Sequence, residues 1–159
     1  MLSINGIPVA AIELKDQLTG QSIDNAKAQW MFDRDRREPA FRLNHRVLVF
    51  FAVDLYQAAM TTKLNGNKTR FFPFNQGSNG AGIDGGAGNP AAIEGRYVTS
   101  YLWENVLQRD SLLDIIQKFI HFEVKKDIET KPDGTERNVT RRNVIFPRYH
   151  QLDVVRKLI

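Results

Sequence analysis

Two side chains near the N-terminus could do chemistry together. Glu13 and Lys15 lie two residues apart at the end of an apolar run, Ile7 to Lys15, which predicts a strand. Because side chains alternate between the two faces of a strand, we expect both to project from one face. The carboxylate could bind Mg²⁺, which prefers oxygen ligands, and the ammonium could orient or deprotonate a water beside a phosphorane-like transition state. Since Glu-x-Lys is a common triplet, both could equally be solvated residues where a strand emerges.

The segments around this pair must hold it in place. Asn5-Gly6 is a strong turn dipeptide, and it predicts a hairpin that leads into the strand. A helix is predicted to follow, with Ser22 as its N-cap and Pro39 ending it. This helix carries Gln29, which is either an amide near the same site or an ordinary surface residue.

A charged segment follows Gln29. Its arginines, Arg34, Arg36 and Arg37, could contact phosphates. Because acidic residues alternate with them, they could equally form a solvated, self-neutralised face.

The rest of the chain alternates between strand and helix patterns. Strands are predicted at 46–54, 59–64, 68–74, 124–128 and 137–145, and helices at 98–107, 112–122 and 149–159. We expect Asp110-Ser111 to cap the second of these helices and Asp133-Gly134 to turn between the last two strands. Together these elements predict an α/β fold, a mixed β-sheet flanked by helices.

A loop rich in glycine and asparagine spans residues 76–90. Glycines of this density can cradle a phosphate, but that motif also needs a Gly-Lys-Ser/Thr sequence opening a helix, and none follows here. We therefore interpret the loop as a connection near DNA or a neighbouring domain.

Composition narrows the function classes further. The 159 residues contain no cysteine, which excludes disulfides and thiolate metal sites and fits a reducing cytoplasm. No apolar run approaches the ~20 residues that span a bilayer, and no signal peptide is evident, so we expect a cytoplasmic protein without a membrane partner. A net charge of +4 and a pI of about 9.5 favour an anionic partner, of which nucleic acid is the commonest.

One glutamine near the C-terminus could read a base. Gln151 follows Phe146-Pro147 and precedes an apolar helix pattern. An amide at the start of a helix can pair with the N6/N7 edge of adenine, and an aromatic ring nearby could pack on that base. The same residues could instead form an ordinary corner between a strand and a helix.

Taken in order, short segments of this chain resemble the restriction (motor) subunit of type I restriction-modification enzymes. The segments are Asn5 to Lys15, Ala28 to Trp30, Arg37 to Phe41, Phe72 to Asn75, Gly88 to Pro90, Tyr101 to Glu104 and Phe146 to Gln151. Each is weak alone, but their order is specific and spans essentially the whole chain.

The resemblance implies a restriction-endonuclease-like (PD-(D/E)xK) core over residues 1–145 and the start of a helicase/ATPase motor over 146–159. It implies that Glu13, Lys15 and Gln29 are catalytic, that Glu13 binds Mg²⁺, and that Gln151 reads the adenine of ATP in the full-length subunit. The implied activity is ATP-dependent type I site-specific DNA cleavage. The implied partners are double-stranded DNA and the methyltransferase and specificity subunits of the complex.

The chain departs from this family pattern in three places. The family's first metal-binding Asp lies on the strand before the Asn-Gly turn and would precede Met1. Asp33 stands where many members have the Tyr of a Gln-x-x-x-Tyr motif, and no Walker A motif follows. We therefore expect a core that is incomplete at its N-terminus, and a chain that alone neither cuts DNA at a useful rate nor hydrolyses ATP. The alternative is a non-catalytic module that docks on DNA or protein.

Overall fold

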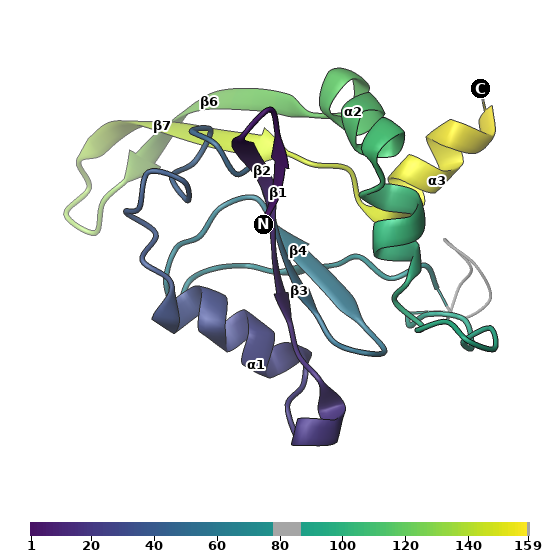
Figure 1. Ribbon diagram of the computed structural model, residues 1–159. Helices are drawn as coiled ribbons and strands as arrows, with labels where there is room; N and C mark the ends of the chain where they lie inside the picture. Colours follow the sequence, from purple (N-terminus) through teal and green to yellow (C-terminus); the bar gives the residue numbers. More distant parts are fainter. Residues whose placement is uncertain (78–86, 159) are drawn as a thin grey trace.

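The computed structural model describes residues 1–77 and 87–158 and shows an α/β protein (Figure 1). A five-stranded mixed sheet has the order β1-β2-β3-β4-β5, and a separate hairpin is formed by β6 and β7. The strands are β1 Leu2–Ile4, β2 Ile7–Leu14, β3 Val49–Val53, β4 Ala58–Thr61, β5 Phe72–Pro73, β6 His121–Thr130 and β7 Glu136–Ile145. The helical segments are η1 Gln17–Thr19, α1 Ile23–Ala28, η2 Gln29–Asp33, η3 Leu102–Val106, α2 Arg109–Lys118 and α3 Tyr149–Leu158.

The first hairpin is confirmed. Asn5 and Gly6 have φ angles of 49° and 80°, which is the left-handed geometry that a tight hairpin turn requires at both central residues. The turn pairs β1 with β2 in antiparallel fashion. The chain then crosses over through α1 and returns as β3, which lies parallel to β2.

The crossover helix begins where the sequence predicts. The Ser22 side chain accepts a hydrogen bond from the Asp24 N–H, and the Asn25 side chain accepts one from the Ser22 N–H, so the two ends of the first turn cap each other. The helix continues as the π-helical turn η2 and ends at Asp33, not at Pro39.

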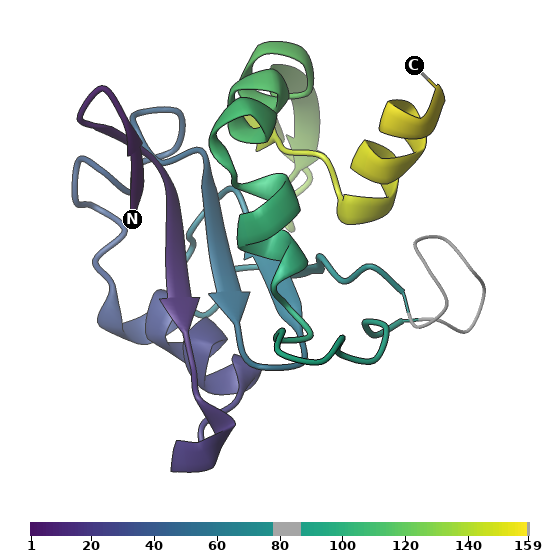
Figure 2. The same cartoon turned by 45° about the vertical axis from the view of Figure 1, so that its right-hand side comes forward.

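The sheet separates two apolar cores, because β3 is buried along its whole length and contributes side chains to both faces. One core packs α1 and Trp30 against Phe50. The other packs η3 and α2 against Phe51 and Phe74. Figure 2 shows α1 and the helical residues 102–118 on opposite sides of the β2–β3 pair.

Several predicted boundaries were wrong. The strand expected over 68–74 is reduced to β5, and the helix expected over 98–107 is only the short η3. The next helix starts at Arg109 and is capped by Gln108, whose side chain accepts from the Asp110 N–H, so Asp110-Ser111 is not the cap. That helix ends at Lys118, because residues 121 and 122 belong to β6.

The C-terminal part follows the predicted order. Gly134 has φ 81° in the turn between β6 and β7, and α3 follows β7.

None of the helices in residues 1–77 and 87–158 is long and apolar enough to cross a membrane. Most of the glycine-rich loop lies in 78–86, outside the described residues.

Candidate functional site

The structure brings Lys15 and Gln29 into direct contact. The Lys15 Nζ donates to Gln29 Oε1 at 2.5 Å, across fourteen positions of sequence. This contact forms because β2 ends beside α1: the Lys15 N–H still bonds the Val53 carbonyl at 2.9 Å, while Gln29 follows the last residue of α1. An amide oxygen aimed at the ammonium holds the lysine at the end of the strand.

Glu13 contacts the residue that directly follows η2. The Arg34 Nε and Nη2 both donate to Glu13 Oε1, at 2.8 and 2.5 Å. The Glu13 side chain is only 13% exposed and that of Arg34 is 41% exposed, so the pair is partly shielded from water. The sequence offered phosphate contact or self-neutralisation for Arg34, and the structure instead places it on the candidate catalytic carboxylate.

The other two arginines of this segment are satisfied locally. Arg37 pairs with Asp35 at 3.0 Å and lowers the pKa of that carboxyl mainly through side-chain hydrogen bonds. Arg36 donates to the Asn65 side chain at 2.6 Å. The interpretation of a solvated face therefore fits Arg37, whereas Arg34 belongs to the site.

The sequence did not reveal a buried carboxylate beside this site, that of Asp54. Its Oδ2 accepts from the Ile23 N–H at 2.9 Å and the Gln17 side chain at 3.1 Å, and its Oδ1 accepts from the N–H groups of Tyr56 and Gln57. Asp54 is 4% exposed and directly follows β3. It therefore ties the N-terminus of α1 to the end of β3, which fixes the helix that leads to Gln29.

The Asp54 signal was present in the sequence but ambiguous. An acidic residue directly after a buried apolar strand is often a solvated end, and two of the four donors that satisfy this one, Gln17 and Ile23, come from distant segments. Only long-range structure identifies it.

The metal donors near Glu13 are few. Within residues 1–77 and 87–158, no group of three or more His, Cys, Asp or Glu side chains could hold an ion. Magnesium is commonly bound through one or two carboxylates completed by water and substrate phosphate, so a single carboxylate is compatible with that mode. Glu13 fits this limited role once Arg34 leaves its Oε1.

Gln151 lies apart from Glu13, near the start of α3. Its Oε1 accepts the Arg148 N–H at 2.9 Å, so it caps the helix, and the residue is exposed. Tyr149 beside it accepts a hydrogen bond from Gln76 at 2.7 Å. The predicted role of Gln151 in binding ATP stays a prediction.

Comparisons of the chain with protein-family models, with curated proteins and with solved structures found no significant match.

Proposed function

We propose that this chain is part of the restriction subunit of a type I restriction enzyme and carries the Glu-x-Lys half of its DNA-cleaving centre. The observation that carries the proposal is the convergence of Glu13, Lys15 and η2 at one end of β2, with Lys15 bonded to Gln29. A hairpin, a crossover helix and a parallel strand in that order also suit a restriction-endonuclease-like core.

The chemistry assigned to each side chain follows from its contacts. Glu13 would hold Mg²⁺ together with a substrate phosphate, and the bound ion would supply Lewis acidity. Lys15 would orient the attacking water and offset negative charge that develops on the phosphate. Gln29 would act as a positioning residue, because its carbonyl oxygen accepts a hydrogen bond from the Lys15 ammonium.

Arg34 limits how Glu13 could bind a metal ion. The Arg34 guanidinium occupies Glu13 Oε1 and places a positive charge beside the carboxylate, so it competes with a metal ion for Glu13. A DNA phosphate is a suitable alternative partner for Arg34, since arginine recognises phosphate in the same two-pronged way as carboxylate. We infer that the chain alone has weak metal affinity and does not cut DNA at a useful rate.

The proposal assigns the remaining roles to the full subunit and its complex. ATP hydrolysis would belong to the motor that we place from residue 146 onward, where Gln151 would contact the adenine. Double-stranded DNA and the methyltransferase and specificity subunits would be the partners of the whole enzyme.

Affinity cleavage tests the metal site without requiring DNA cleavage. Fe²⁺ in place of Mg²⁺, with ascorbate and peroxide, generates hydroxyl radicals that cut the polypeptide near the bound ion. We expect cuts near residue 13 and within η2 that disappear in Glu13→Gln and persist in the matched surface variant Glu129→Gln. Cuts that are unchanged in Glu13→Gln would contradict the proposed metal role.

A further inference from the structure

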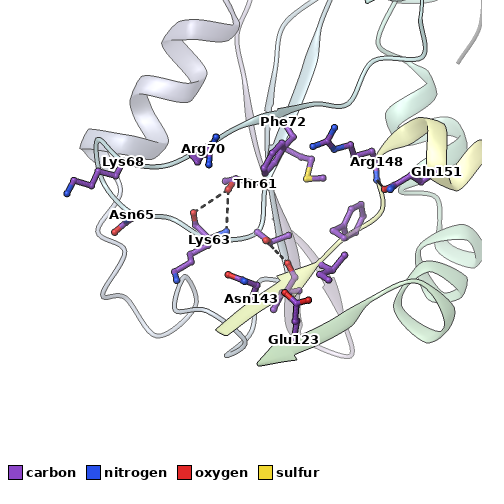
Figure 3. A pocket seen from close by; sticks show the side chains of 15 residues that line it. Thr61, Lys63, Asn65, Lys68, Arg70, Phe72, Glu123, Asn143, Arg148 and Gln151 are labelled. Carbon is purple, nitrogen blue, oxygen red and sulfur yellow. Dashed lines mark hydrogen bonds between the residues drawn. The ribbon is translucent and has the colours of Figure 1, made fainter. Parts of the chain in front are cut away.

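A basic cleft of about 580 Å³ lies between the β4–β5 connection and the β6–β7 hairpin (Figure 3). Its walls carry four cationic side chains, those of Lys63, Lys68, Arg70 and Arg148. The one carboxylate in the wall, Glu123, is paired with Lys125 at 3.2 Å. With four cations and one carboxylate, the cleft accounts for three of the four net positive charges of the chain.

No carboxylate of the described residues neutralises these four cations. In the part of the chain that the structure describes, none of them takes part in a salt bridge. Cations gathered in a concave surface raise the local concentration of anions. The charge of the cleft therefore favours a ligand with several negative charges.

An arginine guanidinium lies over an aromatic ring in the same wall. The Arg148 guanidinium carbon lies 4.8 Å from the centre of the Phe72 ring. Phe72 is 36% exposed, and in Figure 3 it lies between Arg70 and Arg148. Guanidinium planes and aromatic rings are the surfaces on which unpaired nucleobases stack.

Amide groups complete the lining. Asn65, Asn143 and Gln151 line the cleft, and amides can bond the edges of bases or the sugar and phosphate oxygens. In this cleft Gln151 would contact a base of the bound strand in place of the adenine of ATP. An acidic protein segment would pair with the cations but would make no use of the Phe72–Arg148 contact for stacking or of the amides for base recognition. A base-bearing polyanion uses all three features.

We propose that this cleft binds a single-stranded segment of nucleic acid, with phosphates along Lys63, Lys68 and Arg70 and a base stacked on Arg148. A continuous duplex keeps its bases in the helical stack and cannot supply the stacked base. The four cationic side chains and Phe72 are exposed, so a strand can reach them from solvent.

The cleft is separate from the candidate cleavage site. Among the described residues, Glu13, Lys15 and Gln29 do not line the cleft. The cleft proposal therefore goes beyond the proposed cleavage activity and does not depend on it.

Fluorescence anisotropy with a labelled oligonucleotide tests the proposal, using the whole chain in EDTA so that no cleavage occurs. We would compare a mixed-sequence single strand of about 15 nucleotides with its duplex, since a stacking groove covers roughly 4–16 nucleotides. The variants are Lys63→Gln/Lys68→Gln/Arg70→Gln and Arg148→Lys. The matched control, Lys126→Gln/Lys131→Gln/Arg137→Gln, removes three exposed cations from the hairpin outside the cleft.

Counterion release sets the expected sizes. Each single-strand phosphate contact contributes a slope of about −0.7 in log K against log salt, which is about fivefold in affinity at about 0.1 M salt. We expect the triple cleft variant to lose roughly a hundredfold and about two units of slope, and the hairpin control to lose less than about threefold. Arg148→Lys keeps the charge and should still weaken single-strand binding by about fivefold or more.

Four results would overturn the proposal. Equal losses in the cleft and hairpin triples would indicate a diffuse charge effect, and an unchanged Arg148→Lys would remove the stacking role. Tighter binding of the duplex would contradict a single-strand site, and full displacement of the strand by free ATP at equal phosphate concentration would assign the cleft to a mononucleotide. Because this binding assay contains EDTA, it does not depend on the metal site, and failure of the cleavage proposal is read separately from the affinity-cleavage experiment.

Discussion

The buried carboxylate of Asp54 provides the sharpest test of how the site is held together. Replacement by alanine removes the acceptor for four hydrogen-bond donors that come from three segments of the chain. The Ile23 N–H is buried, so it loses its partner without access to water, whereas the Gln17 side chain can turn toward solvent.

The expected loss of stability in Asp54→Ala depends on how buried each of these donors is. A buried donor left without a partner costs about 1–3 kcal/mol, and hydrogen bonds to a charged group contribute about 1.5–3 kcal/mol each, without full additivity. Counting the Ile23 donor in full and the partly buried Tyr56 and Gln57 donors in part, we expect Asp54→Ala to lower the free energy of unfolding by about 3 kcal/mol.

Urea denaturation followed by circular dichroism measures this loss. With a slope of about 2 kcal/mol per molar urea, the midpoint should fall by about 1.5 M. Asp33→Asn changes an exposed acid in η2 and should shift the midpoint by less than about 0.25 M, which corresponds to about 0.5 kcal/mol. Asp54→Ala within that same margin would refute the structural role of the carboxylate.

Two further predictions concern buried aromatic residues. Burial raises the pKa of the Tyr101 hydroxyl, which donates a hydrogen bond to the Phe74 carbonyl at 2.9 Å. The protonated hydroxyl therefore contributes its full stability to the fold below pH about 10, where the tyrosine of the unfolded chain ionises. This stability is lost as pH rises toward the pKa of Tyr101 in the folded protein. Alkaline titration of tyrosinate absorbance should show one tyrosine that ionises only as the chain unfolds, and its ionisation in the folded protein near pH about 10 would contradict this. Trp30→Phe removes the indole donor to the Phe51 carbonyl at 2.9 Å, and it should lower the free energy of unfolding in urea by about 2 kcal/mol, with a loss below about 0.5 kcal/mol counting against it.

Local sequence signals predicted the parts of the fold that local chemistry determines. Asn5-Gly6 requires little beyond its own backbone preference to form a turn, and Ser22 caps α1 through residues within three positions. The cap at Gln108 was missed because glutamine is an uncommon N-cap and the neighbouring Asp110-Ser111 is the stronger pattern.

The site was only partly predictable for a different reason. The spacing of Glu13 and Lys15 indicated a shared face, but their partners depend on where the crossover helix packs. The Glu13–Arg34 pair spans twenty-one positions and the Asp54–Ile23 contact spans thirty-one, so no short pattern encodes either. The basic cleft likewise combines the β4–β5 connection with residues after β7, which only the folded chain brings together.

Metal titration by calorimetry is the most direct measurement of the central claim, that Glu13 is a metal-binding carboxylate held in check by Arg34. We would titrate Mn²⁺ into the native chain, Glu13→Gln and Arg34→Gln. We expect weak binding by the native chain, none by Glu13→Gln, and binding by Arg34→Gln that is about tenfold tighter, because removing the competing hydrogen bonds to a charged group frees about 1.5 kcal/mol. Equal binding by all three proteins would show that Glu13 is not the metal ligand and would contradict the proposed cleavage site.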